Sequence, residues 1–210
     1  MDNVLFQSVS DEVKDTLESY ILNGNTEEYI SCVEGIAGPL CKLVYHAGVK
    51  LYLDAMYKDA MRAFKAVAYL TDSSNYKRLA VVRWCLCLLK IGDEYMADIC
   101  YREMSAPSIV GITTKRHECE FYFLLAEYAL ERNKDLREVV MFIDKGFNAG
   151  QDAGFYCAGF ITTIQTAREL AKKARKYDLD YKLTLIINRI KSSGKLTEEQ
   201  LAYLNEMENT

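Results

Sequence analysis

Proline and long apolar runs are scarce in this chain of 210 residues. Only two prolines occur, Pro39 and Pro107, and this scarcity favours long helices over a fold of short strands and turns. The most apolar run, residues 80–92, is interrupted by Arg83 and Lys90 and is shorter than the roughly 20 residues that cross a bilayer. These absences predict an all-α protein without a membrane-spanning segment.

Patterns typical of disulfides and metal sites are also missing, although the chain has seven cysteines and no CxxC pair. Cys85 and Cys87 would point about 200° apart on a helix and cannot share a metal ion. Most of the seven lie in apolar helical runs: Cys32, Cys41, Cys85, Cys87, Cys100, Cys119 and Cys157. We therefore expect buried free thiols in a reducing compartment. The first 15 residues carry acids where a secretory signal needs bases, so a cytoplasmic location is expected.

A net positive charge is absent as well. The formal charge is −4 and the isoelectric point is near 5.4, which argues against nucleic acid as the main partner. One basic run, KKARK at 172–176, is interpreted as the solvated face of an amphipathic helix. A regulator that binds nucleic acid through this run stays open as an alternative.

Catalytic motifs are missing too. The two histidines, His46 and His117, are far apart in sequence, and HEC at 117–119 lacks the spacing of metal ligands on a helix. No nucleophile elbow, dinucleotide-binding or phosphate-binding glycine motif occurs, and the carboxylates are scattered over helix surfaces. We expect no catalysis, no metal and no cofactor.

What the sequence does contain is a series of amphipathic helices separated by short turns. Breaks are expected at TDSSN (71–75), SAPSIVGITT (105–114) and AGQDAG (149–154). A last short helix is expected after Thr197, which begins a capping-box spacing with Gln200. The other expected helices cover about 11–22, 26–35, 39–55, 57–70, 76–91, 94–104, 115–132, 136–148, 156–176 and 178–191.

Small residues inside these helices predict that pairs of helices pack closely as hairpins. Gly48 and Ala60 mark the crossing in the first hairpin, with Phe64 beside them, and Ala97 and Tyr101 repeat the scheme in the second. A third, weaker hairpin spans about 115–148. The pattern is typical of tetratricopeptide repeats. We expect an N-terminal helical arm at 1–40, an array of three such hairpins at 41–151, and C-terminal capping helices at 152–210.

The residues at 45–72 match a more specific pattern than that of the general repeat. This stretch resembles the first repeat of the class II type III secretion chaperones, with a Y-x-D-A turn followed by A-x-x-F-x-x-L-x-x-L-D. The matching residues are Tyr57, Asp59, Ala60, Phe64, Val67, Leu70 and Asp72. The resemblance covers about 41–150. It implies a cytosolic chaperone whose concave face holds an extended segment of a secreted translocator protein.

By repeat position, the resemblance places a client-binding groove on the first helix of each hairpin. Its residues would be Tyr45, Val49, Tyr52, Val82, Arg83, Leu86, Phe123 and Glu127. For Tyr45 and Tyr52 the alternative is packing against the N-terminal arm, and for Arg83 it is exposure to solvent.

The expected function is therefore to hold an extended apolar segment of another protein before export. A non-catalytic adaptor, forming a permanent subunit of a larger assembly, is the alternative. The arm carries Val4, Leu5, Phe6 and Val9, which suit a homodimer contact but could equally fold back onto the groove. A protein client and a possible homodimer are thus the expected partners, without nucleic acid or membrane insertion.

Overall fold

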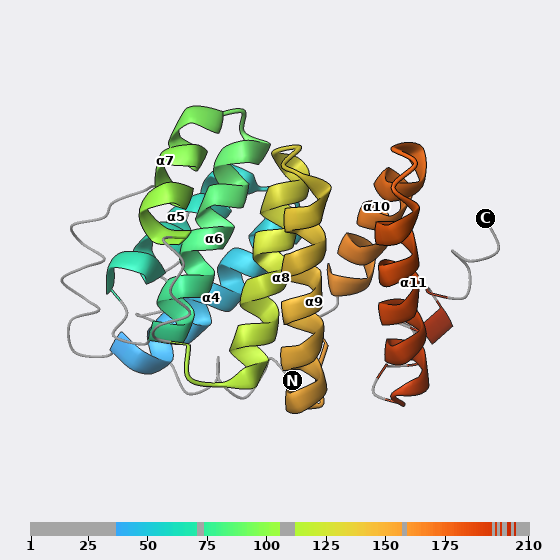
Figure 1. Ribbon diagram of the computed structural model, residues 1–210. Helices are drawn as coiled ribbons and strands as arrows, with labels where there is room; N and C mark the ends of the chain where they lie inside the picture. The colour runs from blue at the N-terminus through green and yellow to red at the C-terminus, as the bar shows by residue number, and fades with distance from the viewer. Residues whose placement is uncertain are drawn as a thin grey trace. The chain divides into compact units, whose positions relative to one another are not determined.

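The computed structural model describes residues 37–70, 74–105, 112–156 and 159–194, together with 196, 198, 201, 202 and 204. In these ranges the chain forms eight α-helices and no strand, so the all-α prediction is confirmed (Figure 1). The chain divides into two compact units, unit 1 at Met1–Gly111 and unit 2 at Ile112–Thr210. None of the described helices is long and apolar enough to cross a membrane.

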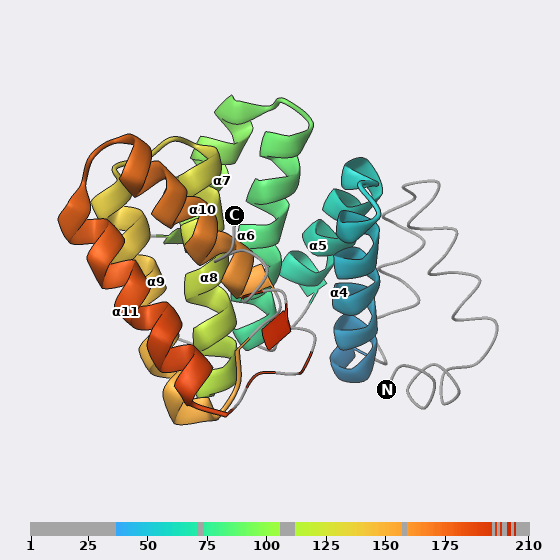
Figure 2. The same ribbon diagram turned by 90° about the vertical axis from the view of Figure 1, so that its right-hand side faces the viewer.

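The described residues of unit 1 form four helices. Its helices are α4 (Ala37–Leu53), α5 (Tyr57–Leu70), α6 (Ser74–Lys90) and α7 (Glu94–Ser105). Each helix packs on the next, and α4 also contacts α6 (Figure 2). At the crossing of α4 and α5, a Cβ added to Gly48 would lie 2.9 Å from a ring carbon of Phe64 and 3.2 Å from Ala63. A glycine is therefore what lets these two helices approach so closely.

In the continuously described part of unit 2, up to residue 194, the chain forms α8 (Lys115–Glu131), α9 (Leu136–Ala153), α10 (Gly159–Lys173) and α11 (Tyr177–Ser192). The pairs α8–α9 and α10–α11 form hairpins, and both α10 and α11 also contact α9. Their buried apolar faces join in one core that extends from Cys119 of α8 to Ile190 of α11 and includes Leu204. The C-terminal helices thus complete the core of α8 and α9.

All four hairpins turn in the same way. Their turns each contain one residue with a positive φ: Ala55, Gly92, Asn133 and Arg175. In each turn the next residue donates its N–H to a carbonyl five positions back, for example Met56 to Leu51 at 2.9 Å and Lys176 to Ala171 at 2.9 Å. This is the Schellman ending of a helix. The four described hairpins therefore share one way of ending their first helix, and α9 ends in the same way at Gly154, where Phe155 donates its N–H to Gly150 at 3.1 Å.

The prediction of a break at 149–154 is wrong. Helix α9 continues through this stretch to Ala153 and ends at Gly154, whose φ is 65°. A Cβ at Gly150 would lie 2.5 Å from the Tyr156 ring, and one at Gly146 would lie 2.5 Å from the Phe123 ring. These two glycines make room for aromatic rings inside the core and do not end the helix. The expected boundary at 151/152 accordingly falls within unit 2.

The expected helices at 11–22 and 26–35, and with them the proposed dimer contact of the N-terminal arm, lie outside the described residues. The helix expected after Thr197 lies mostly outside them as well. Of that stretch, Leu196 and Leu204 are described and pack in the core of unit 2.

Candidate functional site

Tyr45 of α4 lies in an aromatic cluster inside unit 1. Only 2% of it is exposed, and its ring meets the rings of Phe64 and Tyr76 at centroid distances of 5.7 and 5.3 Å. Arg83 of α6 donates its Nε–H to the Tyr45 hydroxyl at 2.9 Å, with its guanidinium carbon 5.7 Å from the centre of that ring. Two residues expected to contact a client thus bind each other.

Three further residues of the expected groove are interior residues. Val82 and Leu86 of α6 are buried, and so is Phe123 of α8. Phe123 stacks on Phe160 of α10 with a centroid distance of 3.5 Å and covers Gly146. The assignment of Tyr45, Val82, Leu86 and Phe123 to an open groove is corrected here, because each side chain is enclosed by the fold. The sequence periodicity marked these positions as apolar but did not show that other helices cover them.

The other expected groove residues keep part of their surface exposed. Val49 and Tyr52 lie on the last turns of α4, and Glu127 lies on α8. The Tyr52 ring meets the Tyr57 ring edge-on across the α4–α5 turn, with centroids 5.4 Å apart. The expected hairpin residues Ala60, Phe64 and Ala97 are buried, and Tyr101 is half-buried. Among the residues expected to line a groove in unit 1, Val49 and Tyr52 near the end of α4 therefore keep accessible surface.

Exposed apolar side chains lie at two turns of unit 1, the α4–α5 turn and the α6–α7 turn. Leu53 and Tyr95 are each 76% exposed. Because successive helices of the unit run in alternating directions, the α4–α5 and α6–α7 turns lie at the same end of it (Figure 2). We call this set the turn-end patch, and its members are Leu53, Met56, Ile91, Tyr95 and Met96. Sequence reasoning missed these residues, although apolar residues beside a solvent-facing turn are a signal that could have revealed them.

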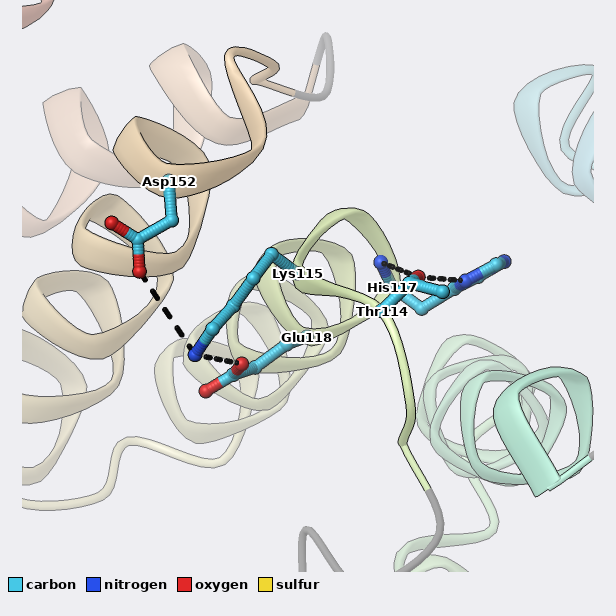
Figure 3. A network of polar contacts seen from close by, with 5 residues as sticks. All are labelled: Thr114, Lys115, His117, Glu118 and Asp152. Carbon is cyan, nitrogen blue, oxygen red and sulfur yellow. Dashed lines mark hydrogen bonds and ion pairs between the residues drawn. The ribbon is translucent and has the colours of Figure 1, made fainter.

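A network of polar side chains surrounds the start of α8 (Figure 3). Thr114 caps this helix by accepting the N–H of His117 at 3.3 Å, and its Oγ lies 2.6 Å from Nδ1 of the His117 ring. Lys115 pairs with Glu118 at 2.7 Å and lies 4.0 Å from Asp152 of α9. Glu118 raises the pKa of Lys115, which keeps this lysine charged. The network caps α8 and links it to α9.

The titratable groups with shifted pKa values include two in the interior. Burial raises the pKa of the Cys85 thiol, and nearby Cys100 adds to the effect. A reactive cysteine needs the opposite shift, because the thiolate is the nucleophile. Burial also raises the pKa of Tyr156 to about 12, and its hydroxyl has no hydrogen-bond partner among the described residues. Within the same part of the chain, no group of three or more residues is placed to hold a metal ion.

Comparisons with known proteins identified no similar protein. No family model, no curated protein and no solved structure matches the chain. The resemblance of residues 45–72 to the secretion chaperones therefore rests on the residues themselves.

Proposed function

We propose that the chain is a non-catalytic binding protein, which holds an extended apolar segment of another protein as the class II type III secretion chaperones do. Its helical hairpins would stack in the manner of tetratricopeptide repeats. The client would be a secreted protein kept from aggregating before export. Binding would begin at the turn-end patch and continue over Val49 and Tyr52.

The order of packing in unit 1 supports the repeat arrangement. In a tetratricopeptide array, the first helix of each hairpin contacts its own partner helix and the first helix of the next hairpin. In unit 1, α4 packs on α5, α5 packs on α6, and α4 also contacts α6.

The turn-end patch is the observation that carries the binding function. Single exposed apolar residues are ordinary, but five large ones at one end of one unit favour a partner. Tyrosine and methionine are enriched in protein interfaces, and methionine adapts its shape to different partners. Two of the five residues are methionines, Met56 and Met96. Such a surface suits a client segment that is recognised mainly by its apolar character.

The test uses a permanently unfolded probe, fluorescently labelled reduced and carboxymethylated α-lactalbumin, and measures its binding to the full chain by anisotropy. The double variant Leu53→Asp, Tyr95→Asp should bind at least about tenfold more weakly, since each loses an exposed apolar anchor. Both side chains are largely exposed, so circular dichroism should show an unchanged fold.

The matched control is Met141→Asp with Leu201→Asp, which places two aspartates at exposed apolar positions of unit 2. This control should bind the probe as the wild type does. Equal binding by all three proteins, or equal losses in both variants, would exclude the turn-end patch as the client site.

The adaptor alternative differs in the lifetime of the complex. A chaperone must release its client, so bound probe should exchange with unlabelled probe within minutes. A permanent adaptor would instead hold its partner through repeated dilution and would lose stability without it.

A further inference from the structure

The outer face of α11 carries apolar side chains, although its opposite face is already buried in unit 2. Tyr177 and Tyr181 are 70% and 65% exposed, and Leu185 is also exposed. On a helical wheel these three fall within about 80° of one another, and buried Leu183 and Ile190 lie about 160–180° from the centre of this arc. A surface helix normally presents polar residues there. No described helix of unit 2 therefore covers this outer strip.

Basic residues gather at one end of this strip, at the turn that joins α10 to α11. Lys172, Lys173 and Arg175 are exposed and form no ion pair with any described residue. Leu170, in the same last turn of α10, is exposed as well. This end of unit 2 thus combines apolar surface with positive charge that no ion pair balances.

Three aspartates of unit 2 are paired with cations of the same unit, whereas exposed Glu169 and Asp178 form no ion pair with any described residue. Asp180 pairs with Arg168 at 3.0 Å, and Asp144 accepts a hydrogen bond from Lys182 at 3.0 Å. Asp135 lies 3.5 Å from Lys176. Pairs formed inside the unit leave the cations at 172, 173 and 175 available to an outside anion.

We propose that the outer face of α11 docks an acidic amphipathic helix of a partner protein. The apolar side of that helix would lie on Tyr177, Tyr181 and Leu185, a strip about 12 Å long that matches two helical turns. Its acidic residues would meet Lys172, Lys173 and Arg175. This surface is separate from the turn-end patch, so the inference does not depend on the proposed client site.

A protein fits the surface better than a nucleic acid does. A nucleic acid needs cations that follow its backbone, whereas here the cations lie at one end and the strip itself is apolar. Exposed Glu169 and Asp178 lie near these cations in the sequence, so the positive charge is not the continuous stripe that a nucleic-acid backbone follows. The exposed rings of Tyr177 and Tyr181 can stack on bases as well as pack on an apolar helix, so an oligonucleotide probe distinguishes the two ligands.

The experiment titrates the full chain into a labelled 18-residue peptide with leucines at helical spacing on one face and glutamates on the other. We expect micromolar binding that weakens as salt rises, because charge contributes to it. The same peptide with lysines in place of the glutamates should bind at least about tenfold more weakly. A 20-nucleotide oligothymidylate and vesicles of phosphatidylcholine with phosphatidylglycerol serve as the competing anionic probes.

Two variants test the contacts separately. Tyr177→Ser with Tyr181→Ser removes the apolar strip, and Lys172→Glu with Lys173→Glu reverses the charge. Each should weaken peptide binding about tenfold, and only the charge reversal should remove the salt dependence. Lys58→Glu with Lys77→Glu is the charge-matched control at exposed positions of unit 1 and should bind as the wild type does.

Several outcomes would overturn the proposal. They are failure of the acidic peptide to bind, binding that is indifferent to both tyrosines, and binding only of the oligonucleotide or the vesicles. The last result would instead favour a nucleic-acid or membrane role for the basic run at 172–176. None of these outcomes bears on probe binding at Leu53 and Tyr95, so the two proposals fail separately.

Discussion

Arg83 of α6 donates a hydrogen bond from Nε to the hydroxyl of Tyr45 on α4, with a length of 2.9 Å. The two residues are 38 positions apart in sequence, and their bond joins the first helices of two successive hairpins. It closes an aromatic cluster that includes Phe64 and Tyr76. Tyr45 is therefore part of the packed interior of unit 1.

Tyr45→Phe should lower the free energy of unfolding by about 1.5–3 kcal/mol, because a hydrogen bond from a charged donor is lost in a buried cluster. Urea unfolding followed by circular dichroism measures this change. Tyr95→Phe, at an exposed position, is the control and should have almost no effect. Unchanged stability together with weaker binding of an unfolded probe would instead return Tyr45 to a client-binding surface.

Gly48→Ala should destabilise the protein by about 1–3 kcal/mol, because the added methyl group would press on the Phe64 ring. The gain of up to about 1 kcal/mol in helix propensity is smaller than this cost. Combining Gly48→Ala with Phe64→Leu should recover part of the loss in the same urea experiment. Gly159→Ala is the comparison, because an added Cβ there meets nothing within 4 Å. A stable Gly48→Ala single variant would show that α4 and α5 are not closely packed.

Ala55→Gly should stabilise the protein by about 0.5–1 kcal/mol. Ala55 has a φ of 59° in the α4–α5 turn, and this left-handed conformation is costly for any residue with a Cβ. Ala47→Gly, inside α4, should have the opposite effect and cost about 1 kcal/mol. Thermal unfolding of both variants distinguishes the effect of the turn geometry from a general effect of glycine. If both variants shifted the melting temperature in the same direction, the proposed role of the turn geometry would be contradicted.

Tyr156→Phe should raise stability by about 1 kcal/mol at neutral pH, because it removes a buried hydroxyl that has no hydrogen-bond partner among the described residues. The difference in unfolding free energy between the variant and the wild type should grow as the pH rises above about 10. The wild-type pKa is near 12 in the folded protein against 10.0 for an unperturbed tyrosine, so the unfolded chain loses its proton first. Ionisation therefore favours unfolding of the wild type over this range and leaves the variant unaffected.

Urea unfolding of both proteins between pH 8 and 11 measures this difference. A difference that stays constant with pH would show that Tyr156 titrates normally and is open to solvent. The buried thiol of Cys85 contributes equally to the two proteins and cancels in the comparison.

Several helices could be predicted because their signals are local. The expected helix at 57–70 coincides with α5, and the one expected at 115–132 ends one residue beyond α8. Turn residues and 3.6-residue periodicity act within a few positions, so a single sequence displays them. The glycine at 150 misled the same reasoning, whereas Gly146 was expected inside the helix. Local propensity assigns this glycine to a break, whereas the ring of Tyr156 requires a glycine at that point of α9.

By itself the sequence determined that the chain is helical, that its helices pair as hairpins, and which face of each helix is apolar. Only the tertiary structure decided which apolar faces are covered. It enclosed Tyr45, Val82, Leu86 and Phe123 and left Leu53, Tyr95, Tyr177 and Tyr181 at the surface. The physical reason is that periodicity arises within one helix, whereas burial depends on neighbouring helices supplied by distant parts of the chain.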